Sequence, residues 1–202
     1  MKRFSIYAFI AFTLTMIIPM PGRFVYGVVL ALEFNIILLL GILINSLIKK
    51  MKLDDLKTFI YIFLFISITI LFRLILKIFQ PEIVLSLGIL IFFPSVSIFL
   101  LGYIFPNSDK NLSEKIKVDM KDSLFYTIYL LLFSLFRDIV GYGTFTFFGT
   151  NHQIYQKVLF DSSKLAFTSI FSSMPGALVV SAIIMYIYFF FRNKFQIIRN
   201  AE

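Results

Sequence analysis

Residues 86–102 read SLGILIFFPSVSIFLLG, and this stretch decides how the rest of the chain is interpreted. It is almost wholly apolar, yet Pro94 stands at its centre, where proline removes a backbone donor and clashes with the preceding helical turn. Inside a bilayer, each backbone group freed in this way needs a partner from the protein or from water. We therefore expect a broken membrane helix that other helices enclose, with Ser95 and Ser97 just past the break.

The composition is typical of a polytopic membrane protein. Of the 202 residues, 59% are hydrophobic and 15% are charged, whereas soluble domains are about 45–50% apolar and about 25% charged. Most of the lysines flank apolar runs, which is a membrane-topology pattern rather than a nucleic-acid-binding surface. We expect a single membrane domain over residues 1–202, in contact with the lipid bilayer and without a nucleic-acid partner.

Residue types that commonly bind cofactors are nearly missing from the sequence. The chain has no cysteine, which excludes a disulfide, a thiolate ligand and a cysteine-held iron–sulfur cluster. Its single histidine, His152, cannot form a metal site alone. The sequence has no His cluster, paired-acid motif or Gly-x-Ser-x-Gly elbow, so it predicts no catalytic residue and no metal ligand.

Six stretches are long and apolar enough to cross a bilayer, which takes about 20 residues. They are residues 4–20, 24–47, 58–79, 83–105, 123–140 and 170–191. The first could be a signal peptide, but it lacks a small-residue cleavage site and runs into Pro19 and Pro21. Between the fifth and sixth stretches, residues 153–167 could lie on the membrane as an interfacial helix.

The basic residues predict the orientation of the chain. Six spans put both termini on one side of the membrane, and that side receives 13 of the 19 Lys and Arg residues, against 6 on the other. Cytoplasmic loops are enriched in basic residues. We therefore predict that both termini are cytoplasmic.

The two halves of the chain, about residues 1–80 and 81–202, share one pattern. Each begins with a proline-marked apolar segment, at Pro19 and Pro21 in the first half and at Pro94 in the second. Three spans per half give the halves opposite orientations, and paired broken helices in such repeats enclose a central site. We predict an all-α fold of six transmembrane helices as an inverted 3+3 repeat, with helices one and four broken. Two unrelated proline kinks are the alternative.

Two opposite charges lie within the predicted spans. Glu33 is about 14 Å and Arg73 about 9 Å from the external end of its helix, at a rise of 1.5 Å per residue. Because an unpaired charge is costly at such depth, we predict that both face the bundle interior and pair, or line a polar cavity. In the alternative, Arg73 points outward and Glu33 is satisfied locally.

Arg137 and Asp138 close the fifth span, and two glycines, Gly141 and Gly143, follow them. The glycines allow a sharp turn with positive φ, so we expect a structural role in the turn out of the helix. A part in cation passage is the alternative. Further break and turn positions are Gly88, Gly102, Pro175 and Gly176.

Four stretches carry a family resemblance when they are taken together in order. They are residues 26–50, residues 86–102, FRDIVGYGT at residues 136–144 and SMPGA at residues 173–177. The chain resembles the Rnf-Nqr membrane subunits, the paired six-span subunits of the sodium-pumping NADH:quinone reductase and of the Rnf ferredoxin:NAD complex. Its cytoplasmic termini are similar to those of the E-type Rnf or D-type Nqr member. The resemblance implies a membrane subunit of an ion-translocating electron-transport complex, packed against a paired homologous subunit.

The resemblance also implies an iron–sulfur cluster that this sequence cannot hold. In the family, the broken first and fourth helices supply cysteines to a cluster between the paired subunits. Here the fourth-helix position falls at Ile98 and the first-helix position near Thr13, and neither residue can bind iron. We expect a subunit without its own redox centre. The alternative function is a six-helix transporter or substrate-capture subunit.

Overall fold

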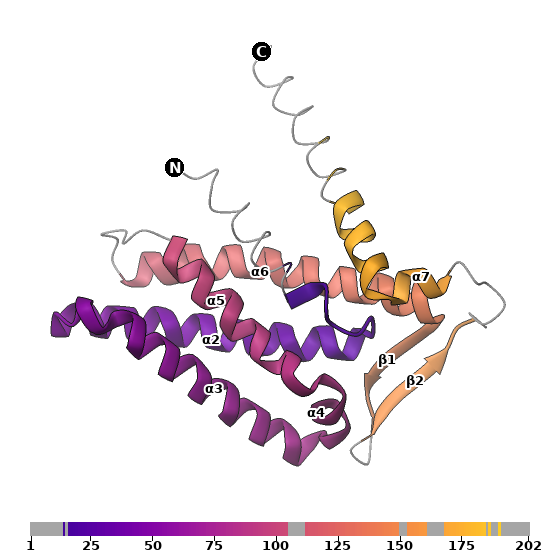
Figure 1. Ribbon diagram of the computed structural model, residues 1–202, viewed down its shortest axis with the longest axis horizontal. Helices are drawn as coiled ribbons and strands as arrows, with labels where there is room; N and C mark the ends of the chain where they lie inside the picture. Colours follow the sequence, from indigo (N-terminus) through magenta and orange to yellow (C-terminus); the bar gives the residue numbers. More distant parts are fainter. Residues whose placement is uncertain are drawn as a thin grey trace, which may run out of the picture.

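The computed structural model describes residue 14 and residues 16–104, 112–149, 153–160, 168–184, 186 and 190. In this part the chain is mostly helical, and the long helices form one bundle (Figure 1). The long helices are α2 (Phe24–Met51), α3 (Lys57–Phe79) and α6 (Leu112–Arg137). The shorter ones are η1 (Asp54–Leu56), α4 (Pro81–Leu87), η2 (Gly88–Phe92), α5 (Phe93–Ile104), the π-helix η3 (Asp138–Tyr142) and α7 (Thr168–Ser172).

Four helical segments of the described chain are long and apolar enough to cross a membrane. They are Phe24–Met51, Lys57–Phe79, Pro81–Leu100 and Ile116–Tyr142, and they correspond to the second to fifth predicted spans. A shorter apolar helix, Met174–Ile184, lies within the sixth. Most of the first predicted span falls outside the described residues. The membrane character of the chain is therefore confirmed, whereas the count of six spans stays a prediction.

The broken segment lies where the sequence predicted it, but a glycine makes the break. Gly88 follows α4 with φ 53° and ψ −115°, a conformation that side chains rarely adopt. The short 3₁₀ turn η2 then leads into α5. Pro94 is the second residue of α5, where its missing N–H has no helical partner to lose. The proline therefore starts a helix here, and Ser95 and Ser97 beyond it are buried.

Residues 144–158 correct the all-α prediction. β1 (Thr144–Phe148) and β2 (Ile154–Val158) form an antiparallel hairpin in which Thr144 lies opposite Val158 and Phe148 opposite Ile154. The predicted interfacial helix is thus wrong over β2, while residues 161–167 lie outside the described chain. The physical reason is that β-branched and aromatic residues favour strands, and in TFTFF Thr144 and Thr146 lie on the face opposite Phe145 and Phe147.

One apolar core joins the segments that the sequence predicted to be broken. Met16, Ile17 and Met20, before α2, share a cluster of buried side chains with Ile91 and Ile98. The cluster continues along α2 and α6 to the helix after α7, through residues such as Phe34, Phe133 and Ala177. Both proline-marked segments therefore face the interior of the bundle. In contrast, α3 buries only Phe65 and Thr69, so most of its surface is free to face lipid.

Candidate functional site

Two adjacent buried charges occupy the end of the bundle that carries the hairpin (Figure 1). α6 ends at Arg137, and the π-helix η3 begins at Asp138. Arg137 is 1% exposed and Asp138 is 0% exposed. Such π-helical turns interrupt α-helices and often mark positions with a special role. The contacts of the two side chains show what this turn achieves.

The Arg137 guanidinium holds the ends of two short helical segments. Nη1 donates to the Met20 carbonyl at 2.7 Å, just before α2. Nη2 donates to the carbonyls of Ser172 (2.8 Å) and Ser173 (3.4 Å), and Nε donates to that of Phe171 (3.3 Å). Carbonyls at a helix C-terminus lack helical partners and carry partial negative charge. Arg137 supplies both the donors and the compensating charge.

The Asp138 carboxylate accepts hydrogen bonds at the start of helix α2, where backbone N–H groups lack helical partners. Its Oδ2 accepts the N–H of Phe24, the first residue of α2, at 3.1 Å. The same oxygen accepts the Thr146 N–H at 2.7 Å and its hydroxyl at 2.6 Å, and Oδ1 accepts the Thr144 hydroxyl at 2.7 Å. The N-cap residue of α2, Arg23, offers no side-chain cap. Asp138 therefore caps α2 from the far half of the chain and fixes β1 beside it.

The remaining turn positions lie in several elements, some of them beside this joint. Gly143 has the positive φ that the sequence predicted, 66°, whereas Gly141 lies inside η3 without a positive φ. The Ser173 hydroxyl accepts the N–H of Gly176 at 3.3 Å, as an N-cap does, and so it starts the helix Met174–Ile184, which has Pro175 in its first turn. Pro19 and Pro21 lie in the turn before α2, and Gly102 lies in α5. The arrangement is what a structural role requires, and a part in cation passage stays a prediction.

Glu33 and Arg73 do not form the predicted pair. Glu33 is 0% exposed, and neither of its carboxyl oxygens has a hydrogen-bond partner among the residues that the structure describes. Arg73 is exposed. It lies six residues before the end of α3, and from there its long side chain can extend toward the membrane surface. The geometry thus supports the outward Arg73 of the alternative but not its locally satisfied Glu33.

A polar side chain of α3, Thr69, approaches Glu33. The Thr69 side chain on α3 is close enough to interact with the Glu33 carboxyl, although it completes no hydrogen bond to either oxygen. The Thr69 and Ser95 hydroxyls share a hydrogen bond, and the Ser95 hydroxyl donates to the Phe65 carbonyl at 3.4 Å. Sequence reasoning missed Thr69. Its only signal was a threonine, two residues after Ser67, within a largely apolar run.

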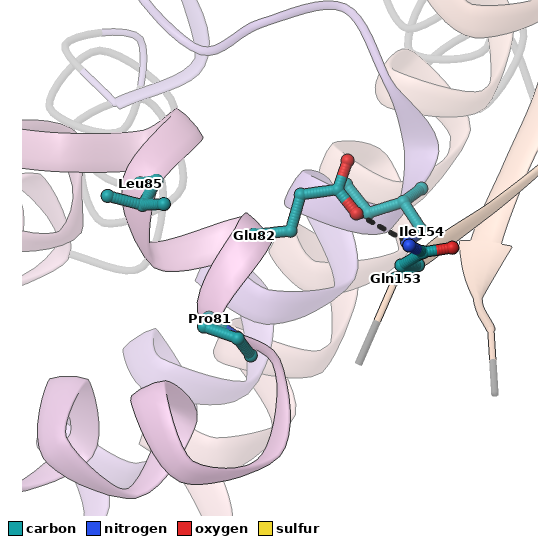
Figure 2. Close-up of a pocket in the computed structure, with 5 residues that line it drawn as sticks. All are labelled: Pro81, Glu82, Leu85, Gln153 and Ile154. Carbon is teal, nitrogen blue, oxygen red and sulfur yellow. Dashed lines mark hydrogen bonds between the residues drawn. The ribbon is translucent and has the colours of Figure 1, made fainter. Parts of the chain in front are cut away.

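A further polar contact lies at the surface, between α4 and the hairpin. Glu82 accepts the N–H of Ile154 at 2.7 Å, beside a shallow, open pocket (Figure 2). The five residues that line this pocket are Pro81, Glu82, Leu85, Gln153 and Ile154. The pocket contributes one exposed carboxylate and no buried polar group, so it serves as a contact between two elements.

The residues at the position of the expected cluster do not fit iron. Ile98 is 4% exposed and packs in the apolar core, and Thr13 lies outside the described chain. Where the structure describes the chain, no three His, Asp or Glu residues gather as a metal site would require. A cluster held by cysteine thiolates has no ligand here, because the sequence contains no cysteine.

Replacing Arg137 by Lys tests the joint between the two helix ends. A lysine ammonium cannot reach both Met20 and Ser172 as the guanidinium fork does, so the free energy of unfolding should fall by about 2–3 kcal/mol. Denaturant unfolding of the purified protein in detergent micelles measures this change. Arg73→Lys, at an exposed arginine, is the control and should stay within about 0.5 kcal/mol of the wild type. Equal stability of the two variants would contradict the assignment.

Replacing Asp138 by Asn tests the cap of α2. The amide offers one acceptor oxygen and turns an N–H₂ group toward donors, so one or more of the four hydrogen bonds is lost. We expect a loss of about 2–3 kcal/mol in unfolding free energy. The matched control is Glu82→Gln, whose carboxylate also accepts one backbone N–H but is exposed. A larger effect at Glu82 than at Asp138 would refute the cap.

Comparison with known proteins assigns the chain to a family. The family of Rnf-Nqr subunit membrane proteins matches residues 6–185, which include α2, the broken segment, the Arg137–Asp138 joint and the start of the last helix. No curated protein and no solved structure matches the chain. The family match spans well over half of the 202 residues. The chain therefore belongs to the Rnf-Nqr family of membrane subunits.

Proposed function

We propose that this chain is a membrane subunit of an ion-translocating electron-transport complex of the Rnf/Nqr kind. The observation that carries the proposal is the family match over residues 6–185. Subunits of this family work within multi-subunit complexes, so the chain is expected to pack against a second, homologous membrane subunit and other members. The exposed apolar surface of α3 supplies area for lipid or for such a neighbour.

The proposed architecture is six spans in an inverted 3+3 repeat. In its support, the segment before α2 turns at Pro19, and the α4–η2–α5 segment is interrupted at Gly88. Both segments contribute to one core. The Arg137 contacts with Met20 and Ser172 link the first half of the chain to the second, which suits a repeat whose halves meet head to tail.

The subunit is further proposed to lack a redox centre of its own. Its support is chemical: the position expected to hold the fourth-helix cysteine is Ile98, an apolar side chain in the core. In this proposal the chain contributes its helices and the Arg137–Asp138 joint to the membrane part of the complex, and electron transfer runs through other subunits. No step of that transfer is assigned to residues of this chain.

Both termini are proposed to be cytoplasmic, in a bacterial inner membrane. The turn between α2 and α3, which carries Lys49, Lys50 and Lys52, lies at the opposite end of the bundle from the hairpin (Figure 1). Because cytoplasmic loops are enriched in Lys and Arg, this turn is assigned to the cytoplasm. The hairpin, with Lys157 on β2, is then external.

Affinity purification from native membranes tests the assignment to a complex. The tagged chain, extracted in a mild detergent, should copurify in fixed proportion with a homologous six-span protein and with subunits that carry flavin or iron–sulfur centres. Mass spectrometry and a cofactor spectrum of the eluate identify them. A stable complex with a transporter ATPase would instead favour the transporter alternative, and a chain that elutes alone would contradict a subunit role.

Thiol labelling tests the orientation, because the cysteine-free chain gives a blank background. Two single-cysteine variants, Lys157→Cys on β2 and Lys50→Cys at the end of α2, replace exposed lysines. A membrane-impermeant maleimide added to intact spheroplasts should label the first variant, and the second only after lysis. The reverse pattern would overturn the predicted orientation.

A further inference from the structure

We propose that the β1–β2 hairpin is a lipid-binding element that lies in the headgroup layer of the bilayer. Its exposed aromatic and aliphatic side chains insert between the lipids, and Lys157 binds their phosphates. The proposal rests on the membrane character of the helices and on the contacts of the hairpin. It requires no partner subunit, so it goes beyond the proposed function.

The hairpin is fixed to the ends of two membrane-spanning helices. At the start of α2, the Phe24 ring stacks on the rings of Phe145 and Phe147, with centroids 5.6 and 6.2 Å apart. Just past the end of α3, the Gln80 side chain donates to the Gly149 carbonyl at 3.4 Å. The 23 residues of α3 extend about 34 Å, whereas the hydrocarbon core is about 30 Å thick. The ends of α3 therefore reach the headgroup layers, and the tip of the hairpin lies at that level.

The other two candidate spans hold the hairpin at the same level. Glu82, in the first turn of α4, accepts the Ile154 N–H of β2 at 2.7 Å. β1 begins two residues after η3, where the span Ile116–Tyr142 ends. The two strands run across the end of the bundle instead of continuing along the helices (Figure 1). Both strands therefore follow the membrane surface.

The free edge of β2 limits how deeply the hairpin can lie. The Leu159 N–H donates to the Gly143 carbonyl at 2.8 Å. Because bonded pairs alternate along antiparallel strands, the backbone groups of Gln156 and Val158 point away from β1, and the Ile154 N–H on the same edge is bound by α4. In the described chain the sheet has two strands, so this edge needs water, which the hydrocarbon core lacks. The hydrated headgroup layer supplies it.

The exposed side chains of the hairpin suit this layer. Tyr155 is 56% exposed and Val158 is 67% exposed, and the two lie on opposite faces of β2. Leu159 and Phe160 continue the exposed surface, and Phe147, opposite Tyr155, is exposed as well. Neighbouring apolar side chains left exposed in this way mark an interaction surface. Tyrosine is enriched at membrane interfaces, because its ring enters the lipid while its hydroxyl stays in water.

The charge of the hairpin complements lipid phosphate. Residues 139–160 contain no Asp or Glu, and Lys157 is exposed on β2. The carboxylate that approaches from α4, that of Glu82, is occupied by the Ile154 N–H. A lysine close to the surface is attracted to anionic lipids, and its long side chain lets the ammonium stay among the phosphates.

Apolar surface on the neighbouring helix ends makes lipid the occupant. Ile78 and Phe79, at the end of α3, are exposed, and so is Leu85 in α4. Leu85 lines the shallow pocket together with Ile154 of the hairpin (Figure 2). Side chains of this kind at the ends of membrane helices face lipid. The lipids that surround these helix ends therefore also reach the hairpin.

Tryptophan fluorescence of the full-length chain in vesicles tests the proposal, because the sequence contains no tryptophan. Tyr155→Trp is reconstituted in phosphatidylcholine, which is then replaced by phosphatidylcholine brominated on its acyl chains near the glycerol. These bromines should quench roughly half or more of the emission, and acrylamide in the water should quench less. Val158→Trp, on the opposite face of β2, should behave in the same way, and it provides the test if Tyr155→Trp fails to fold.

Two control variants calibrate the quenchers. Phe63→Trp, exposed within α3, should respond to brominated lipid and little to acrylamide. Asp55→Trp, in the exposed turn between α2 and α3, should respond mainly to acrylamide. Emission of Tyr155→Trp that follows the pattern of Asp55→Trp would overturn the proposal. Protection from both quenchers would also overturn it, because a second copy of the chain would then cover the hairpin.

The role of Lys157 is tested in the Tyr155→Trp background. Brominated phosphatidylglycerol, mixed with unlabelled phosphatidylcholine, should reach the tryptophan about two- to fivefold more often than brominated phosphatidylcholine at the same fraction. Lys157→Gln should remove this preference, and a preference that survives would refute the assigned role of Lys157. None of these results depends on copurification with other subunits, so this inference and the proposed function can fail separately.

Discussion

Helix ends that terminate inside a membrane protein expose backbone groups that must find partners, and the rest of this structure depends on how that requirement is met. Two consecutive residues meet it with opposite charges. Arg137 binds the carbonyls that end two short helical segments, and Asp138 binds the first N–H of α2. The π-helical turn η3 begins at Asp138, directly after α6 ends at Arg137. With water excluded, such charge-assisted hydrogen bonds gain strength, so one dipeptide joins residues 20–24, strand β1 and residues 171–173.

Hydropathy predicted the four long spans because each lipid-crossing helix needs a continuous apolar run, and these runs are plain in the sequence. The hairpin was not predicted from the sequence, because its two strands are short and a hydrophobic segment of that length is compatible with either a helix or a strand. The Glu33–Arg73 pair failed for another reason. Depth along a helix can be counted from the sequence, but the direction in which Arg73 points depends on packing. Thr69 became significant only once α3 lay against α5.

The chain belongs to the Rnf-Nqr family, yet its sequence contains no cysteine. The parts that shape the backbone are present: the interrupted helix at Gly88, the joint at Arg137 and Asp138, and the capped helix start at Ser173. The position expected to hold a metal ligand is instead a buried Ile98. Backbone geometry here rests on charges and caps, so it does not require a cluster.

The joint also constrains the order in which the chain can be completed during synthesis. The donor to the Met20 carbonyl, Arg137, lies 117 residues further along the chain. The acceptor of the Phe24 N–H, Asp138, lies 114 residues further along. Arg137 in turn waits for carbonyls 34 to 36 residues later. The first half therefore enters the membrane with its opening turn unsatisfied. That turn gains its partners once Arg137 and Asp138 have been synthesised, and the joint is complete only when residues 171–173 follow.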